Sequence, residues 1–206
     1  MVLPTSLNRM PVLVIMGVSG SGKSTVAGML AGRLGWDLAE GDDMHPPANV
    51  AKMAAGHPLD DADRWPWLDQ IAAWIREHAE AGRPGIITCS ALKKSYRDVL
   101  RGDHVVFVDL VGTHDQIAAR LTARHGHFMP AGMLDSQIET LEPPSAEEDA
   151  IRIDVTASSY EASEQIISRL HLMGSAASTQ PQESPCTIAN DCASTSVATT
   201  IPTKRS

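Results

Sequence analysis

Residues 17–24 read Gly-Val-Ser-Gly-Ser-Gly-Lys-Ser, which completes the pattern G-x-x-x-x-G-K-[ST] of a phosphate-binding loop. A short, mostly β-branched apolar run at residues 12–16 precedes the loop, and apolar residues recur at helical spacing after it. A loop of this kind binds phosphate when it joins a buried strand to the start of a helix, because the helix N-terminus then faces the anion. The context therefore favours a nucleotide site over a glycine-rich turn without a ligand.

The residue types within the loop predict separate roles. Gly17, Gly20 and Gly22 are expected to take backbone conformations that other residues avoid, so that N–H groups point toward a polyphosphate. Lys23 is predicted to reach the β- and γ-phosphates, and Ser24 to ligate Mg²⁺. The predicted nucleotide-binding set is Gly17, Val18, Ser19, Gly20, Ser21, Gly22, Lys23, Ser24 and Thr25.

Apolar segments alternate with helical patterns along the chain, which predicts a parallel sheet covered on both faces. The predicted strands are 12–16, 85–90, 105–110 and 151–155, with a weaker one at 36–40. Asp63 is predicted to cap a helix whose apolar positions include Trp67 and Trp74, and these tryptophans are interpreted as core residues. Thr113 is predicted to cap a later helix, and the last helix is expected over 159–172.

The chain has 206 residues, and we predict one domain over 11–173 between a short extension, 1–10, and a tail, 174–206. The tail is rich in Ser, Thr, Ala and Pro and lacks periodicity, so it is expected to be disordered and to carry none of the chemistry. Cysteine occurs three times, with Cys186 and Cys192 in the tail, which gives no disulfide framework. Cys89 is expected to be a small buried residue.

The formal net charge of −8 argues against binding of nucleic acid through a broad basic surface. No apolar run approaches the roughly 20 residues that cross a bilayer, and the first ten residues lack the apolar core of a signal peptide. We therefore expect a soluble, cytoplasmic protein with neither nucleic acid nor membrane as a partner.

An acidic segment, Glu-Gly-Asp-Asp-Met-His-Pro at 40–46, follows the weaker strand and is expected at the carboxyl edge of the sheet, near the loop. A phosphoryl acceptor needs a carboxylate that orients its hydroxyl and takes the proton. Asp42 is the candidate for this base and for holding Mg²⁺ through water. Asp43 is the less certain member of the pair, with a solvent-facing position as its alternative, and both carboxylates could instead cap a turn.

Cationic residues near the predicted helix starts are candidates for binding an anionic substrate. Arg64 can bind such a group bidentately, although a salt bridge to Asp60 or Asp61 fits the spacing at least as well. Ser90, at the expected junction of a strand and a helix, and Lys93 are predicted to contact the substrate.

Three further cations, Lys94, Arg97 and Arg101, are interpreted mainly as the solvated face of the helix that follows Ser90.

Arg120 and Arg124 are four residues apart and therefore share a helix face, and Gly126 permits a bend just beyond them. This pattern predicts a lid, at about 120–142, whose arginines neutralise the transferring phosphoryl group. Closure of such a lid would also exclude water. No cysteine or carboxylate cluster completes a zinc site with His125 and His127, so His127 is interpreted as a lid or substrate contact.

Taken in order, these segments resemble the thermoresistant-type gluconokinases over about residues 10–172. The motifs are the loop at 17–24, Glu-Gly-Asp-Asp-Met-His-Pro with Asn49 and Lys52-Met53, Gly-His-Pro-Leu-Asp-Asp-Ala-Asp-Arg-Trp-Pro-Trp-Leu at 56–68, Cys-Ser-Ala-Leu-Lys-Lys-Ser-Tyr-Arg-Asp at 89–98, Gly-His-Phe-Met at 126–129, Leu-Asp-Ser-Gln at 134–137 and Leu-Glu-Pro-Pro at 141–144.

The resemblance implies a three-layer α/β/α P-loop kinase fold with a five-stranded parallel sheet and a small lid. It implies transfer of the γ-phosphate of ATP to the 6-hydroxyl of D-gluconate, giving 6-phospho-D-gluconate for gluconate catabolism and the pentose phosphate pathway, and a homodimer. Asp42 matches the aspartate of the family's Gly-Asp-x-x-His-Pro motif, whereas Asp43 stands where that motif varies. Other candidates lie inside matching motifs: His45, Arg64, Ser90, Lys93, Arg124 and His127.

Two alternatives stay open at this point. The first is a related P-loop kinase that acts on shikimate, a nucleotide or another sugar acid. The second is an ATP-binding regulatory protein without turnover.

Overall fold

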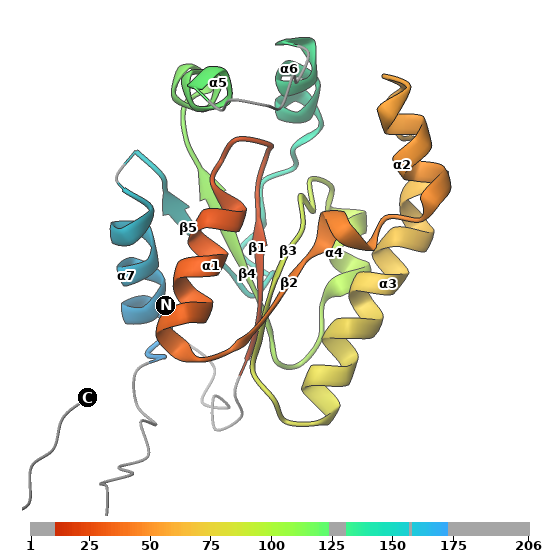
Figure 1. Cartoon of the computed structure of the whole chain (residues 1–206). Coiled ribbons are helices and arrows are strands. Elements are labelled where there is room, and N and C mark those ends of the chain that lie inside the picture. Colours follow the sequence, from red (N-terminus) through yellow and green to blue (C-terminus); the bar gives the residue numbers. More distant parts are fainter. Residues whose placement is uncertain (1–10, 124–130, 157, 173–206) are drawn as a thin grey trace, which may run out of the picture. The chain divides into compact units, whose positions relative to one another are not determined.

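The computed structural model describes residues 11–123, 131–156 and 158–172, which form a five-stranded parallel sheet with helices around it (Figure 1). The spatial order of the strands is β2-β3-β1-β4-β5. Their bounds are β1 Val12–Met16, β2 Asp37–Glu40, β3 Gly85–Thr88, β4 Val105–Val111 and β5 Ala150–Asp154. All five predicted strands are present, and the strand predicted over 85–90 ends two residues early.

The central strand β1 is buried along its whole length, which explains its uninterrupted apolar sequence. Val12 pairs with Gly85 of β3 on one side and with Val105 of β4 on the other. Because these three strands are parallel and start in register, their carboxyl ends meet at one edge of the sheet.

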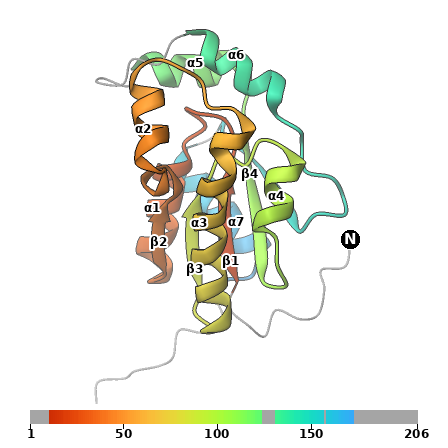
Figure 2. The same ribbon diagram turned by 90° about the vertical axis from the view of Figure 1, so that its right-hand side faces the viewer.

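Helices α1 (Lys23–Leu34) and α7 (Ser159–Arg169) cover one face, and α3 (Asp61–Glu80) and α4 (Lys94–Leu100) cover the other (Figures 1 and 2). Side chains of β1 alternate between the two cores: Leu13 and Ile15 pack with the first pair, and Val12, Val14 and Met16 with the second. This is the three-layer α/β/α arrangement that the family resemblance implied.

The remaining elements lie at or beyond the carboxyl ends of the strands. They are the short 3₁₀ helix η1 (Gly41–Met44), α2 (Pro47–Ala54), α5 (His114–Ala123) and α6 (Ala131–Thr140). Figure 1 shows α5 and α6 side by side above this end of the sheet. The predicted lid, about 120–142, includes the end of α5 and all of α6, and α2 projects from the side of the sheet that carries β2. In the part of the chain that the structure describes, no helix is long and apolar enough to cross a membrane.

The start of α3 corrects one sequence prediction. Asp60, not Asp63, is the N-cap: its carboxylate accepts the Asp63 N–H at 3.0 Å, and the Asp63 carboxylate accepts the Asp60 N–H at 2.9 Å. Together they form a capping box, in which residues three apart satisfy each other's N–H groups. Aspartate is a good N-cap at either position, so the sequence pattern alone did not separate the two.

Arg97 also differs from its prediction. Its side chain is only 1% exposed, whereas the sequence predicted a solvated face. The guanidinium binds Glu148 through two hydrogen bonds, of 2.5 and 3.1 Å, and donates to the carbonyl groups of Ala91 and Glu142. A buried arginine with this many acceptors fixes the position of α4 and of two connecting segments against each other.

Candidate active site

The phosphate-binding loop has the backbone that its glycines predict. Gly17, Gly20 and Gly22 have φ angles of 132°, 80° and 97°. A Cβ atom on Gly17 would lie 2.8 Å from the Leu110 carbonyl oxygen, and one on Gly20 would lie 2.6 Å from Leu121 Cγ. Both positions therefore require glycine for the backbone conformation and for the close approach of neighbouring elements.

The N–H groups of the loop divide into two sets. Gly17 donates to the Ser90 carbonyl at 3.3 Å, Ser21 to the Val18 carbonyl at 3.2 Å, and Ser19 to Gln137 Oε1 at 2.7 Å. The N–H groups of Gly20 and Gly22 have no hydrogen-bond partner among the described residues. Helix α1 begins directly afterwards, so these N–H groups and the helix N-terminus form an anion-binding surface.

Lys23 and Ser24 both lie at the start of α1. The Lys23 ammonium donates to the carbonyl groups of Gly17 and Val18, both at 3.1 Å, and so stays over the loop. The Ser24 hydroxyl donates to Glu40 at 3.1 Å, and the same Glu40 oxygen accepts from the Thr88 hydroxyl at 2.6 Å.

Glu40 and Thr88 received no role from the sequence. The sequence did contain a signal for them, because each is the last residue of its strand at the carboxyl edge of the sheet. Glu40 and Thr88 are partners in the β2–β3 register.

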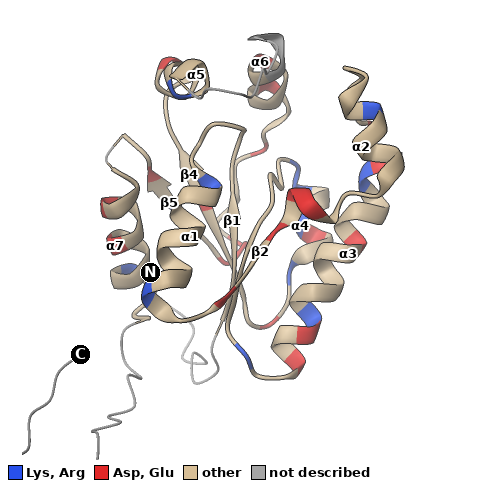
Figure 3. Cartoon of the chain, in the orientation of Figure 1, with Lys and Arg blue, Asp and Glu red and all other residues tan. Residues whose placement is uncertain are grey.

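A hollow of about 520 Å³ brings the loop together with residues from distant segments. Asp42, of η1, and Arg120, of α5, both line it, and Figure 3 shows the acidic η1 and the cationic start of α1 at the same end of the sheet. The full lining is Ser19, Gly20, Gly22, Lys23, Ser24, Thr25, Asp42, Thr88, Arg120, Ala123, Ser158 and Ser159. A carboxylate and a guanidinium thus face the phosphate-binding surface.

The position of Arg120 agrees with an interaction with phosphate. Its guanidinium donates to the Val155 carbonyl, and its Nη1 atom is 3.9 Å from the point where a Cβ atom on Gly22 would lie. The cation is thereby held against the N-terminus of α1. Ser158 and Ser159, which the sequence analysis did not select, reach the same hollow from the start of α7.

The second predicted group, around Arg64 and Lys93, is a polar cluster outside the lining of that hollow. Lys93 donates to both carboxylate oxygens of Asp61, at 2.9 and 2.8 Å, and the Tyr96 hydroxyl donates to Asp61 at 2.6 Å. Arg64 donates to the Tyr96 hydroxyl at 3.3 Å and lies 3.6 Å from Asp61. The alternative of a salt bridge from Arg64 to Asp61 is therefore present, and two cations share one carboxylate.

The pKa values in this cluster follow its hydrogen bonds. The bond from Lys93, with that from Tyr96, lowers the pKa of Asp61, and the bond to Asp61 raises the pKa of Lys93. Burial, with the hydrogen bond to Asp61, raises the pKa of Tyr96. At neutral pH the cluster therefore contains two cations, one carboxylate and a neutral phenol, which is a surplus of one positive charge for an anionic ligand.

His45 lies against Trp67, with ring centroids 4.3 Å apart and planes 13° from parallel. Trp67 itself is buried in the α3 core, as predicted. Burial lowers the pKa of His45, opposed by Asp42 and assisted by Arg64. The lowered pKa favours the neutral form of the His45 imidazole near neutral pH.

Ser90 is not where the sequence placed it. Strand β3 ends at Thr88 and α4 begins at Lys94, so Ser90 is separated from the helix by a turn that includes Ala91, at a φ of 44°. A residue in the left-handed region cannot belong to a right-handed helix, so the helix starts after Ala91, and the apolar spacing of the sequence did not indicate this. Ser90 contributes its carbonyl group to the loop, through Gly17.

The remaining sequence-predicted candidates are Asp43, Arg124 and His127. Asp43 is exposed and does not line the hollow, which agrees with its solvent-facing alternative. Arg124 and His127 lie outside the described residues, as do His125 and the rest of 124–130. Cys89 is buried, and burial raises its pKa to about 12, so it is a structural thiol.

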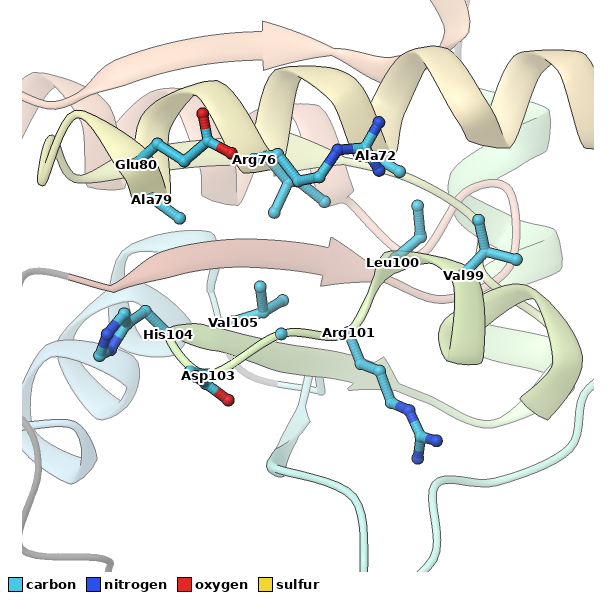
Figure 4. Close-up of a pocket in the computed structure, with 12 residues that line it drawn as sticks. Ala72, Arg76, Ala79, Glu80, Val99, Leu100, Arg101, Asp103, His104 and Val105 are labelled. Carbon is cyan, nitrogen blue, oxygen red and sulfur yellow. The ribbon is translucent and has the colours of Figure 1, made fainter.

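A separate hollow of about 300 Å³ lies between α3 and the α4–β4 connection (Figure 4). Its lining includes Val105, the first residue of β4, so it lies at the opposite edge of the sheet from the phosphate-binding loop. Its floor is apolar, and Arg76 and Glu80 come from the helix that bounds it. This hollow is not part of the candidate site.

Comparison with known proteins agrees with this geometry. A family model described as an AAA domain matches residues 12–144. The gluconokinase of Gluconobacter oxydans (strain 621H) is 55% identical over 143 residues, which cover 68% of this chain and 80% of that protein. The chain belongs to the gluconokinase family.

Other members of the gluconokinase family show the same relationship in sequence and in structure. The thermoresistant gluconokinase of Escherichia coli (strain K12) is 45% identical over 147 residues, which cover 70% of this chain and 84% of that protein. The crystal structure of a gluconokinase from Sinorhizobium meliloti 1021 matches with a TM-score of 0.72 and 42% identity, over 80% of this chain and 94% of the other. The family resemblance read from the motifs is confirmed.

Proposed function

We propose that the protein transfers the γ-phosphate of ATP to the 6-hydroxyl of D-gluconate and releases ADP and 6-phospho-D-gluconate. The observation that carries the proposal is the hollow in which Asp42 and Arg120 face a phosphate-binding loop, in a chain of the gluconokinase family. Homologues named gluconokinase supply the identity of the acceptor.

In the donor half, the N–H groups of Gly20 and Gly22 and the N-terminus of α1 bind the phosphates of ATP. The Lys23 ammonium moves from the loop carbonyls to the β- and γ-phosphates. Arg120, already held against the start of α1, neutralises negative charge on the transferring group, and Arg124 is proposed to share this role.

The donor atoms around Ser24 fit Mg²⁺, which prefers oxygen ligands and takes several of them from phosphate and water. Ser24 Oγ and the Glu40 carboxylate are 3.1 Å apart, and Asp42 lines the same hollow. Among the described residues, no group of three or more His, Cys, Asp or Glu side chains could form an all-protein metal cage. Ser24 is proposed as a direct ligand, with Glu40 and Asp42 acting through water, and the ion would neutralise phosphate charge.

In the acceptor half, Asp42 orients the 6-hydroxyl and removes its proton as the oxygen attacks phosphorus. The neutral His45 ring and the Ser90 segment contact the sugar hydroxyls. Arg64 and Lys93, which share Asp61, provide the surplus positive charge for the gluconate carboxylate. His127 is proposed as a further acceptor contact.

The wider organisation also remains proposed. The domain boundaries at 11 and 173, the homodimer and the cytoplasmic location rest on the sequence and the family resemblance.

The test is an assay of ADP release coupled to a spectroscopic readout, with ATP and Mg²⁺, with and without D-gluconate. We expect ADP release to depend on D-gluconate and to fall sharply with shikimate, nucleoside monophosphates and other sugar acids. Preference for one of those acceptors would indicate a related kinase. ATP binding without acceptor-dependent ADP release would indicate a regulatory protein.

The role of Asp42 has a matched control in its neighbour Asp43. Asp42→Asn should lower kcat by about 10²- to 10⁴-fold, the usual contribution of a positioned general base. Asp43→Asn should leave kcat nearly unchanged, because Asp43 does not line the hollow, whereas Asp42 does. Normal turnover in Asp42→Asn would remove Asp42 from the mechanism.

A further inference from the structure

Gln137, on α6, makes a hydrogen bond to the phosphate-binding loop from 118 residues away in the sequence. Its side-chain oxygen accepts the Ser19 N–H at 2.7 Å. The side chain of Gln137 is partly buried, and the bond joins the helix beyond the sheet edge to the third residue of the loop.

The bond acts on the part of the loop whose backbone N–H groups would face the phosphates. The N–H groups of Gly17, Ser19 and Ser21 are held by protein acceptors, while those of Gly20 and Gly22 have no partner among the described residues. Among the described residues, two of the acceptors for these N–H groups are backbone carbonyls and the third is the side chain of Gln137. The Ser19 N–H belongs to the peptide between Val18 and Ser19, so the bond fixes the plane of that peptide. The next N–H along the chain is that of Gly20, and fixing the peptide before it restricts the directions that this N–H can take.

Helix α6 is braced well enough to serve as a fixed support. Leu134 is 4% exposed and packs in one cluster with Val18 of the loop, Leu92 and Ile117. Just beyond α6, the Glu142 N–H donates to the Leu92 carbonyl at 2.8 Å, and its carboxylate accepts the Lys94 N–H at 2.6 Å. Gln137 therefore projects from a helix that is fastened on both sides of it.

We infer that Gln137 is a positioning residue that holds the phosphate-binding loop in its nucleotide-ready conformation before ATP arrives. The loop then loses less conformational entropy when it binds ATP, and its affinity for the polyphosphate is correspondingly higher. The inference rests on nucleotide binding by the loop and does not depend on the identity of the acceptor.

The test compares Gln137→Met, which keeps the length of the side chain and removes the acceptor, with Ser136→Ala on the same helix. Calorimetry should give a Kd for ATP about tenfold higher in Gln137→Met, the equivalent of one typical hydrogen bond. The Kd for adenosine, which lacks phosphates, should not change. In turnover the KM for ATP should rise while kcat at saturating ATP is maintained, and Ser136→Ala should behave as the unaltered protein.

Amide hydrogen exchange at Ser19, measured without nucleotide, separates the hydrogen bond from the bulk of the side chain. Exchange should be faster in Gln137→Met and remain slow in Gln137→Glu, which retains an oxygen acceptor of the same reach. An unchanged Kd for ATP in folded Gln137→Met, or an equal loss of adenosine and ATP binding, would overturn the inference. Calorimetry and hydrogen exchange need no acceptor, so failure in these two measurements is distinguishable from failure of gluconate phosphorylation.

Discussion

The hydroxyl of Ser24 donates to the carboxylate of Glu40 across 3.1 Å, and this carboxylate also accepts from Thr88. The start of α1 is thus connected to the ends of β2 and β3. Ser24 is oriented by a charged oxygen before any nucleotide binds. A carboxylate behind a metal ligand affects metal affinity without touching the ion, because it fixes the ligand.

Replacement of this carboxylate should therefore weaken the use of Mg²⁺. Glu40→Gln is expected to raise the Mg²⁺ concentration for half-maximal activity by roughly 10- to 100-fold, the usual effect of losing an outer-shell partner. This concentration is measured by titrating activity with Mg²⁺ at a fixed ATP concentration. Asp37→Asn, on the same strand but paired with Arg83 and His78, is the control and should leave the Mg²⁺ requirement unchanged. An unaltered titration in Glu40→Gln would separate Glu40 from the metal site.

The buried pair between Arg97 and Glu148 should dominate the stability of the α4 region. Arg97→Met leaves the Glu148 carboxylate, whose side chain is 6% exposed, without its main partner. We expect a loss of about 3–5 kcal/mol in the free energy of unfolding, measured by urea denaturation. The double variant with Glu148→Leu should recover much of this loss, since no unpaired charge remains buried. Equal losses in the single and double variants would contradict this explanation.

The same pair predicts a pH dependence. The hydrogen bonds from Arg97 hold the pKa of Glu148 below its ordinary value of 4.5. Its contribution to stability is therefore complete above about pH 4.5 and is lost as the pH falls through the lower pKa of the folded state. In Arg97→Met, unfolding free energies measured between pH 6 and pH 3 should fall less steeply over this acidic window than in the unaltered protein.

Asp109 is a buried carboxylate whose removal should stabilise the protein. The residue is 0% exposed, neither oxygen has a hydrogen-bond partner in the described structure, and Arg152 Nε lies 3.2 Å away on a half-exposed side chain. Burial raises the pKa of Asp109, so the folded state is favoured at low pH, and this advantage is lost as the pH rises through the raised pKa.

Asp109→Leu should accordingly increase the free energy of unfolding at pH 7 by about 1–2 kcal/mol, because the charge is no longer buried while the half-exposed Arg152 keeps its hydration. Thermal or urea unfolding measures it, and the gain should shrink toward pH 4. A destabilised Leu variant at pH 7 would show that the ion pair with Arg152 outweighs the cost of burying the carboxylate.

The capping box of α3 gives a smaller prediction. Asp60→Ala removes the acceptor for the Asp63 N–H and should lower the free energy of unfolding by about 1 kcal/mol. Asp69→Ala, at an exposed position within the same helix, is the control and should have little effect. Equal effects at the two positions would show that the carboxylate acts through charge rather than as a cap.

The local sequence pattern was sufficient to predict the strands, most of the helices and the phosphate-binding loop. The strand at 12–16, the glycines of the loop and the start of α1 are adjacent in the chain, so spacing and residue type specify them together. Motif order likewise identified the family. The sequence pattern failed where two local solutions are nearly equivalent, as with Asp60 and Asp63. It also failed after Ser90, where the left-handed residue Ala91 delays the start of the predicted helix to Lys94.

The sequence by itself determined the three-layer fold, the phosphate-binding loop and the membership of the gluconokinase family, because each depends on periodicity or on contiguous motifs. Only the tertiary structure decided which distant groups meet. At the site, Glu40 accepts from Ser24 and Gln137 accepts from Ser19, and away from the site Arg97 is buried against Glu148. Such pairs depend on how parallel strand ends and covering helices meet in space. Hydrophobic periodicity fixes that a residue faces inward, but it carries no information about the partner it finds there.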